Sequence, residues 1–224
     1  MAGSADYVYT PTVEAGEREF DVKYGSAKQA DGTEEQVISA GGGYGVSEFW
    51  FTEVYLKREI AQGISNLTIG EWENKFQLTE TGKYAVDVGL LTEFEAPLSD
   101  SNEPYEFKFG ALLQREYGKV QLNGNLLFER KFGHGAGAPT EIGYQWQAKY
   151  RWQPTLEFGA QGIGELGKWD EWEHDDQAHR MGPAVFGKVA LGNHQYIKYN
   201  SALLFGVSTG APAHTFRFQA EYEF

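Results

Sequence analysis

The sequence predicts an all-β protein, a 12-stranded antiparallel up-and-down transmembrane β-barrel, and three observations lead to this fold class. Apolar and polar residues alternate with a period of two, as in strands with one apolar and one wet face. An even number of such segments follow one another, joined by alternately short and longer connections. No apolar run approaches the roughly 18 residues that a transmembrane helix needs.

The first half of the chain supplies six of the predicted strands. In the first segment, Phe20, Val22 and Tyr24 share one face, and acidic residues share the other with Lys23. The second segment contains "AGGGYG", which leaves its polar face nearly bare. Glycine allows a small barrel to curve sharply, and the bare wall also leaves room near 41–45 for a solute, a loop or a partner. The six segments are 17–27, 36–46, 49–60, 68–78, 84–95 and 105–114.

The second half repeats the pattern, most clearly in "EIGYQWQAKYRW". Its six segments are 119–131, 140–152, 155–166, 181–191, 196–208 and 214–224. Short turns are expected at 47–48, 79–83, 115–118, 153–154 and 192–195, and longer loops at 28–35, 61–67, 96–104, 132–139, 167–180 and 209–213. The expected organisation is an N-terminal stub at 1–16 and a single transmembrane barrel domain at 17–224, with both termini at the short-turn end.

The polar face is predicted to line the lumen and the apolar face to meet lipid. Twelve strands enclose more space than side chains easily fill, and charged residues at mid-strand suit a water-filled interior. Barrel closure also pairs the backbone groups that hydrocarbon cannot satisfy. Aromatic residues near strand ends suit the membrane interfaces: Trp50, Tyr84, Tyr105 and Trp152. A soluble sandwich or propeller is the alternative.

Composition excludes several other classes of protein. The net charge of −13 offers no basic footprint for nucleic acid. The chain has no cysteine, so neither a disulfide framework nor a thiolate site is available. We expect no cofactor. The opening "MAGSAD" lacks the features of a signal peptide and resembles a start methionine placed before a processed N-terminus.

In strand rhythm, loop asymmetry, lack of cysteine and an aromatic last strand, the whole chain resembles bacterial outer-membrane β-barrels of the small-porin size class. The resemblance is architectural and points to no specific member. It implies a location in the bacterial outer membrane, with the lipid bilayer and the barrel-assembly machinery as partners. It also implies that the last strand is the assembly signal, carried by Phe218, Tyr222 and Phe224.

Charges on the polar face are distributed unevenly along the chain. Acids dominate the first five predicted strands, whereas acids and bases balance in the other seven. The acidic wall comprises Glu19, Asp21, Glu53, Glu71, Glu73, Asp87 and Glu93, and the basic wall comprises Lys149, Arg151, Lys188, Lys198 and Arg217. Opposed charges set selectivity in pores. We therefore expect a weakly cation-preferring channel for passive diffusion of small polar or ionic solutes. A plugged barrel, serving as a scaffold or as a sheath for a periplasmic partner, is the alternative.

Two further groups of residues are candidates for metal binding or catalysis. The loop 167–180 offers metal ligands in His174, Asp175, Asp176 and His179, although their spacing matches no strong motif and a solvated acidic loop is the simpler interpretation. Outer-membrane lipases need a histidine close to a serine, and no histidine has a serine two residues further along its strand. Asp175, Asp176 and His179 match the Asp pairs and the Asp-His pair of omptin-like proteases only loosely. We therefore expect no enzyme, with a hydrolase as a weaker alternative.

Overall fold

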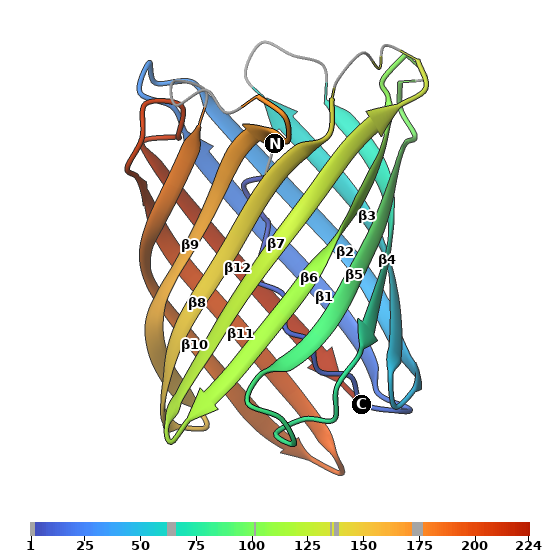
Figure 1. Ribbon diagram of the computed structural model, residues 1–224, viewed down its shortest axis with the longest axis vertical. Helices are drawn as coiled ribbons and strands as arrows, with labels where there is room; N and C mark the ends of the chain where they lie inside the picture. The colour runs from blue at the N-terminus through green and yellow to red at the C-terminus, as the bar shows by residue number, and fades with distance from the viewer. Residues whose placement is uncertain (1–2, 62–65, 101, 135, 137–138, 172–176) are drawn as a thin grey trace.

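In the computed structural model, the described chain runs from residue 3 to 224 without 62–65, 101, 135, 137–138 and 172–176. It forms a closed barrel of 12 antiparallel strands (Figure 1), which confirms the predicted fold class. Strands β1 (Arg18–Lys28) and β12 (His214–Glu223) close the ring. The others are β2 (Glu34–Ser47), β3 (Trp50–Ala61), β4 (Leu67–Gln77), β5 (Asp87–Pro97), β6 (Tyr105–Tyr117), β7 (Val120–Phe132), β8 (Glu141–Gln153), β9 (Leu156–Lys168), β10 (Ala178–Gly192) and β11 (Gln195–Gly206).

Two connections differ from the prediction. Strand β10 starts at Ala178, earlier than expected, because residues 178–180 pair with β9; His179 therefore belongs to a strand and not to a loop. The connection between β4 and β5 covers 78–86, so Tyr84 lies outside the strands and is exposed. The alternation around Tyr84 was therefore a misleading strand signal.

The outer surface of the barrel is apolar and its inner surface is polar. Phe20 is 52 % exposed while its neighbour Asp21 is 1 % exposed, and Val54 at 61 % follows Glu53 at 4 %. Large exposed apolar side chains recur on this outer face from β1 to β12. Such a continuous apolar belt would be costly in water and suits lipid. Among the described residues, no helix is long and apolar enough to cross a membrane.

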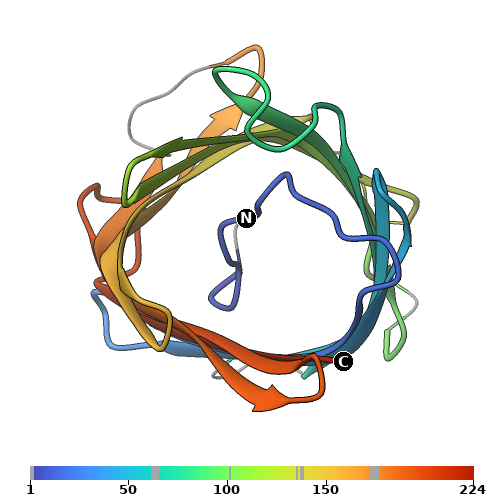
Figure 2. The same cartoon turned by 90° about the horizontal axis from the view of Figure 1, so that it is seen from below.

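Residues 3–17 lie inside the barrel, and we call them the luminal segment. Figure 2 shows this dark-blue chain within the ring of strands. In Figure 1 the described chain starts near the end with the longer loops, descends through the lumen and enters β1 at the opposite end, where Phe224 also lies. The expectation that both termini lie at the short-turn end is therefore wrong for the N-terminal side. Because the number of strands is even, β1 starts at Arg18 at the same end of the barrel at which β12 ends. The luminal segment, which precedes Arg18 in the sequence, crosses the barrel from the other end.

Candidate functional site

Glycines on the inner wall make room for the luminal segment. A Cβ atom added at Gly25 would collide with the backbone of Ser4, and one at Gly45 would collide with the carbonyl of Glu14. A Cβ added at Gly89 would lie 2.9 Å from Cβ of Pro11, closer than real Cβ contacts. Glycines from three strands thus leave a track along which the segment runs.

A patch of leucines on the inner wall holds the middle of the segment. Leu91, Leu112 and Leu127, on β5, β6 and β7, form this leucine wall, and Tyr9 packs against it. Leu91 and Leu112 are fully buried and Tyr9 is 5 % exposed. Burying a large apolar side chain stabilises by roughly 1.5–3 kcal/mol, so these contacts favour retention of the segment in the lumen.

Hydrogen bonds fix the same residue in place. The Tyr9 hydroxyl donates to Glu93 at 2.9 Å, and its backbone amide donates to Gln145 at 3.4 Å. Asn125 donates from Nδ2 to the Tyr9 carbonyl at 3.1 Å. Further along the segment, Val13 donates its amide to Gln77 at 2.7 Å. At the long-loop end, Arg180 donates to the Gly3 carbonyl at 2.9 Å.

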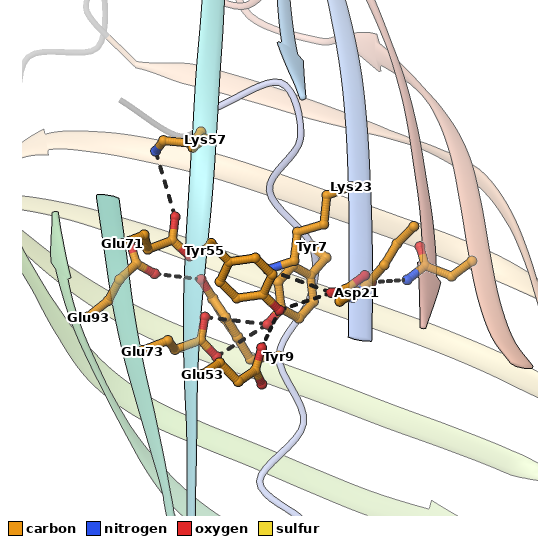
Figure 3. Close-up of polar contacts among 12 residues, drawn as sticks. Tyr7, Tyr9, Asp21, Lys23, Glu53, Tyr55, Lys57, Glu71, Glu73 and Glu93 are labelled. Atoms are coloured by element: carbon orange, nitrogen blue, oxygen red, sulfur yellow. Dashed lines mark hydrogen bonds and ion pairs between the residues drawn. The ribbon is translucent and has the colours of Figure 1, made fainter. Parts of the chain in front are cut away.

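A buried cluster of charged and phenolic groups surrounds Tyr7 (Figure 3). Its hydroxyl donates to Glu73 at 3.2 Å, and the Lys23 ammonium lies over its ring at 4.1 Å from the centroid. The Tyr55 hydroxyl contacts Asp21 at 3.0 Å and also contacts Glu53. Buried charges require such partners, so the cluster depends on Lys23 and on phenolic donors.

The residues of the predicted acidic wall lie on the inner faces of β1, β3, β4 and β5, and lysines accompany them. Lys108 pairs with Glu93 at 2.7 Å, and Lys57 pairs with Glu95 and lies 3.9 Å from Glu71. Asp87 has a structural role, because its Oδ1 accepts the amide of Gly82 at 2.8 Å. The inner faces that bear these acids are therefore partly neutralised by Lys23, Lys57 and Lys108.

The residues of the predicted basic wall also point inward, and nearby carboxylates accompany most of them. Arg217, 1 % exposed, donates from Nη2 to Asn200 at 2.7 Å. The ion pairs are Lys149–Glu157 (3.0 Å), Arg151–Glu116 (2.6 Å), Lys188–Glu223 (3.3 Å), and Lys198 with Glu17 (3.0 Å), Glu221 (2.6 Å) and Glu223 (2.8 Å).

Two cavities touch the luminal segment from opposite ends. One of about 320 Å³ lies toward the longer loops and is lined by Asp6, Lys108 and Glu141 among others. The other, of about 890 Å³, lies toward the short turns. Tyr7, Thr10, Thr12 and Val13 contribute to its lining. Residues of the luminal segment therefore border both cavities.

Two carboxylate clusters in the described chain have a geometry that suits a metal, but a lysine is already present at each. Lys198 contacts every member of Glu17, Glu221 and Glu223, and Lys57 contacts two members of Glu71, Glu93 and Glu95. An ammonium with three donors thus supplies the positive charge near these carboxylates that a metal ion would otherwise provide.

The predicted metal candidates in the loop receive little support. His174, Asp175 and Asp176 lie outside the described residues. His179 contacts the Tyr144 hydroxyl through Nδ1 and Gln177 through Nε2, both at 3.0 Å. Its contact with Ser208 runs through the backbone amide, so the hydrolase alternative gains no support from this histidine either.

The bare inner wall of β2 is filled by the chain itself. The ring of Tyr55 lies against Gly41, that of Phe51 lies against Gly43, and Glu14 reaches Gly45. The room expected near 41–45 for a solute or partner is therefore taken. The sequence did not lead us to predict the luminal segment. Leu91, Leu112 and Leu127 stand at inward-facing positions of their strands and were a signal for it.

The predicted assembly signal lies in β12 and at Phe224, which directly follows it. Phe218 and Phe224 are exposed on the outer face, 39 % and 51 % respectively, and Tyr222 stacks on Phe224 with ring centroids 5.3 Å apart. Its role in assembly stays a prediction.

No protein-family model and no curated protein sequence matches this chain. Its fold is similar to that of the COG4313 outer membrane channel from Pseudomonas putida F1, with a TM-score of 0.62 and 14 % identity over 97 % of this chain and 98 % of that one. It is also similar to the translocator domain of the autotransporter NalP from Neisseria meningitidis, with a TM-score of 0.50 and 11 % identity over 94 % of this chain and 88 % of that one. The predicted resemblance to outer-membrane β-barrels is thus confirmed at the level of the fold.

Proposed function

We propose that the protein is a porin-like channel of the bacterial outer membrane, in which small polar or ionic solutes diffuse through a charged lumen that the luminal segment constricts. The observation that carries this proposal is the polar, cavity-bearing interior beneath an apolar exterior. The similarity in fold to an outer-membrane channel supports it. A closed barrel in lipid presents its interior as the path for polar solutes.

A weak preference for cations follows from the charges at the constriction. Asp21, Glu53 and Glu73 are each at most 4 % exposed and gather around Lys23 and the phenol of Tyr7. Carboxylates thus exceed ammonium groups at this level, whereas the basic wall is largely paired with its own carboxylates. A ring rich in carboxylates favours cations over anions.

A sealed barrel is the second candidate, and the burial of the luminal segment favours it. Tyr9 and Val8 are nearly inaccessible, and Tyr9 is bonded to β5, β7 and β8. If this seal never opens, the barrel serves as a scaffold and not as a pore.

Planar-bilayer recording separates the two functions. We expect the full chain to give small conductance steps with cation preference, and a variant lacking residues 3–14 to give steps several-fold larger, because conductance grows with the open cross-section. A silent full chain with a conducting deletion variant would support the sealed barrel. Clear anion preference of the full chain would contradict the charge argument.

A further inference from the structure

Acids predominate on one wall of the larger cavity and bases on the opposite wall, with Lys75 among the acids and Glu157 among the bases. In the closed ring β2 and β8 lie six places apart, so they face each other across the lumen. Glu19 and Asp21 on β1 and Glu53 on β3 flank β2, whereas Lys149 and Arg151 lie on β8. All of these residues line the same cavity of about 890 Å³.

The acidic side has an acceptor that the protein leaves unsatisfied. Asp21 is 1 % exposed, and its Oδ1 has no hydrogen-bond partner among the described residues. Its Oδ2 accepts from Gln219 at 2.7 Å, lies 3.0 Å from the Tyr55 hydroxyl and lies 3.9 Å from the Lys23 ammonium, so Oδ1 is the oxygen that the described chain leaves without a donor. That hydroxyl has one proton and two carboxylates within reach, Asp21 and Glu53, so one of them always lacks it. A buried carboxylate short of donors is a site for a cationic group.

The basic side offers donors that suit a carboxylate. Within the described chain, both side-chain hydrogen bonds of Arg151 run from Nη2, to Glu116 and to Gln121. Its side chain is 40 % exposed, and the guanidinium has further N–H groups. Guanidinium groups bind carboxylates through paired hydrogen bonds. Lys119 lines the same cavity and adds positive charge.

The luminal segment closes the inner end of this space. Thr10, Thr12 and Val13 contribute to its lining there, with two hydroxyl groups among them. The volume lies in the range of about 300–1,000 Å³ usual for small-molecule sites. A solute entering from the short-turn end would therefore stop between the charged walls before it meets the constriction.

We propose that this cavity binds a small zwitterion, a short peptide, with its ammonium toward Glu19, Asp21 and Glu53 and its carboxylate toward Arg151. The inference rests on the proposed channel function and deepens it by naming the class of solute. A molecule with both charges satisfies both walls at once, whereas a simple ion satisfies only one.

Calorimetric titration of the refolded full chain in detergent tests the proposal. The probe is triglycine, whose charged ends lie about 10 Å apart when it is extended. The comparison compounds are N-acetyltriglycine, which keeps only the carboxylate, triglycine amide, which keeps only the ammonium, and N-acetyltriglycine amide, which has neither. We expect triglycine to bind about tenfold or more tightly than either singly charged analogue, since each end makes charge-assisted hydrogen bonds. The neutral analogue should not bind.

Single substitutions assign the two ends. Arg151→Gln should weaken triglycine and N-acetyltriglycine but leave triglycine amide unchanged, and Glu19→Gln should do the reverse. Lys131→Gln is the matched control, because Lys131 pairs with Glu106 at the long-loop end and does not line this cavity.

Equal binding of triglycine and one singly charged analogue would overturn the proposal in favour of a simple ion site. Absence of triglycine binding, or no effect of either substitution, would also overturn it. The titration does not depend on conductance. A conducting barrel that fails to bind triglycine therefore refutes only this inference, and a silent barrel that binds it refutes only the channel.

Discussion

The leucine wall and the end of β8 near the short turns face the same lumen, yet the first is apolar and the second is positively charged. Leu91, Leu112 and Leu127 are nearly inaccessible because the luminal segment packs on them. On β8, Lys149 and Arg151 border a cavity. The luminal segment covers the inner wall in the first region, where Tyr9 buries the leucines, whereas the second region borders an open cavity; we call them the covered wall and the wet wall. Outward faces show no such contrast, since lipid demands apolar side chains all round.

The largest expected difference in unfolding free energy between the two walls comes from removing the cation of a buried ion pair. Lys108 pairs with the 2 % exposed Glu93, whereas Arg151 pairs with the 43 % exposed Glu116. Lys108→Gln should cost about 3–5 kcal/mol of unfolding free energy, because it leaves a buried carboxylate without its cation. Arg151→Gln should change this free energy by at most about 1 kcal/mol, because water screens the exposed pair.

Urea unfolding of both variants in lipid vesicles measures the difference. Equal losses in the two variants would contradict the division into a covered wall and a wet wall. They would imply that water reaches Glu93 as readily as it reaches Glu116.

Leucine packing gives the next effect and offers a control one residue away. Leu112 is fully buried against the luminal segment, whereas Leu113 points outward and is 42 % exposed. Leu112→Ala should cost about 2–5 kcal/mol through loss of contacts and the cavity left behind. Leu113→Ala should cost less, about 1 kcal/mol, because lipid refills the space. If the same unfolding assay shows a larger loss of unfolding free energy for Leu113→Ala than for Leu112→Ala, contacts on the lipid face of β6 stabilise the barrel more than those with the luminal segment.

The fold could be predicted from the sequence because lipid imposes one rule on every strand. The alternation in segments such as 140–152 predicts an inward and an outward face, and an even number of strands allows the first and last strands to pair antiparallel and close the ring. The luminal segment could not be read in this way. Residues 3–17 belong to no strand, so no periodicity predicts their position. Their contacts are dispersed over β1, β2, β4, β5, β6, β7, β8, β10 and β11.

The candidate site was therefore predicted only in part. The alternation along each strand predicts which charged residues face the lumen. It does not predict which of them pair, because pairing depends on how far the side chains extend toward other strands. The ion pair of Lys198 with Glu17, for example, joins residues far apart in the sequence. Leucines at 91, 112 and 127 break the polar phase of three adjacent strands. Such a departure indicates a covered inner wall and is the signal that sequence reading should use.

The smallest expected effect on stability has the clearest consequence for function. Gly89→Val adds a side chain where a Cβ would already lie 2.9 Å from Pro11, whereas Gly124 has no atom within 4 Å of such a Cβ. We expect Gly89→Val to cost about 1–3 kcal/mol, the usual range for overpacking. The same Cβ would lie 3.1 Å from the Phe76 carbonyl on β4, but its two nearest atoms belong to Pro11, so we expect the luminal segment to shift first.

Displacement of the segment should then appear in the conductance. In planar bilayers Gly89→Val is expected to shift the channel toward the larger steps of the variant that lacks residues 3–14, and Gly124→Val to behave like the parent chain. If Gly89→Val leaves the steps unchanged while destabilising the protein, the clash is relieved in the wall of β5. The luminal segment would then be a fixed part of the barrel, and the contrast between covered and wet walls would describe packing alone. If the steps grow, the covered wall is covered by a removable element.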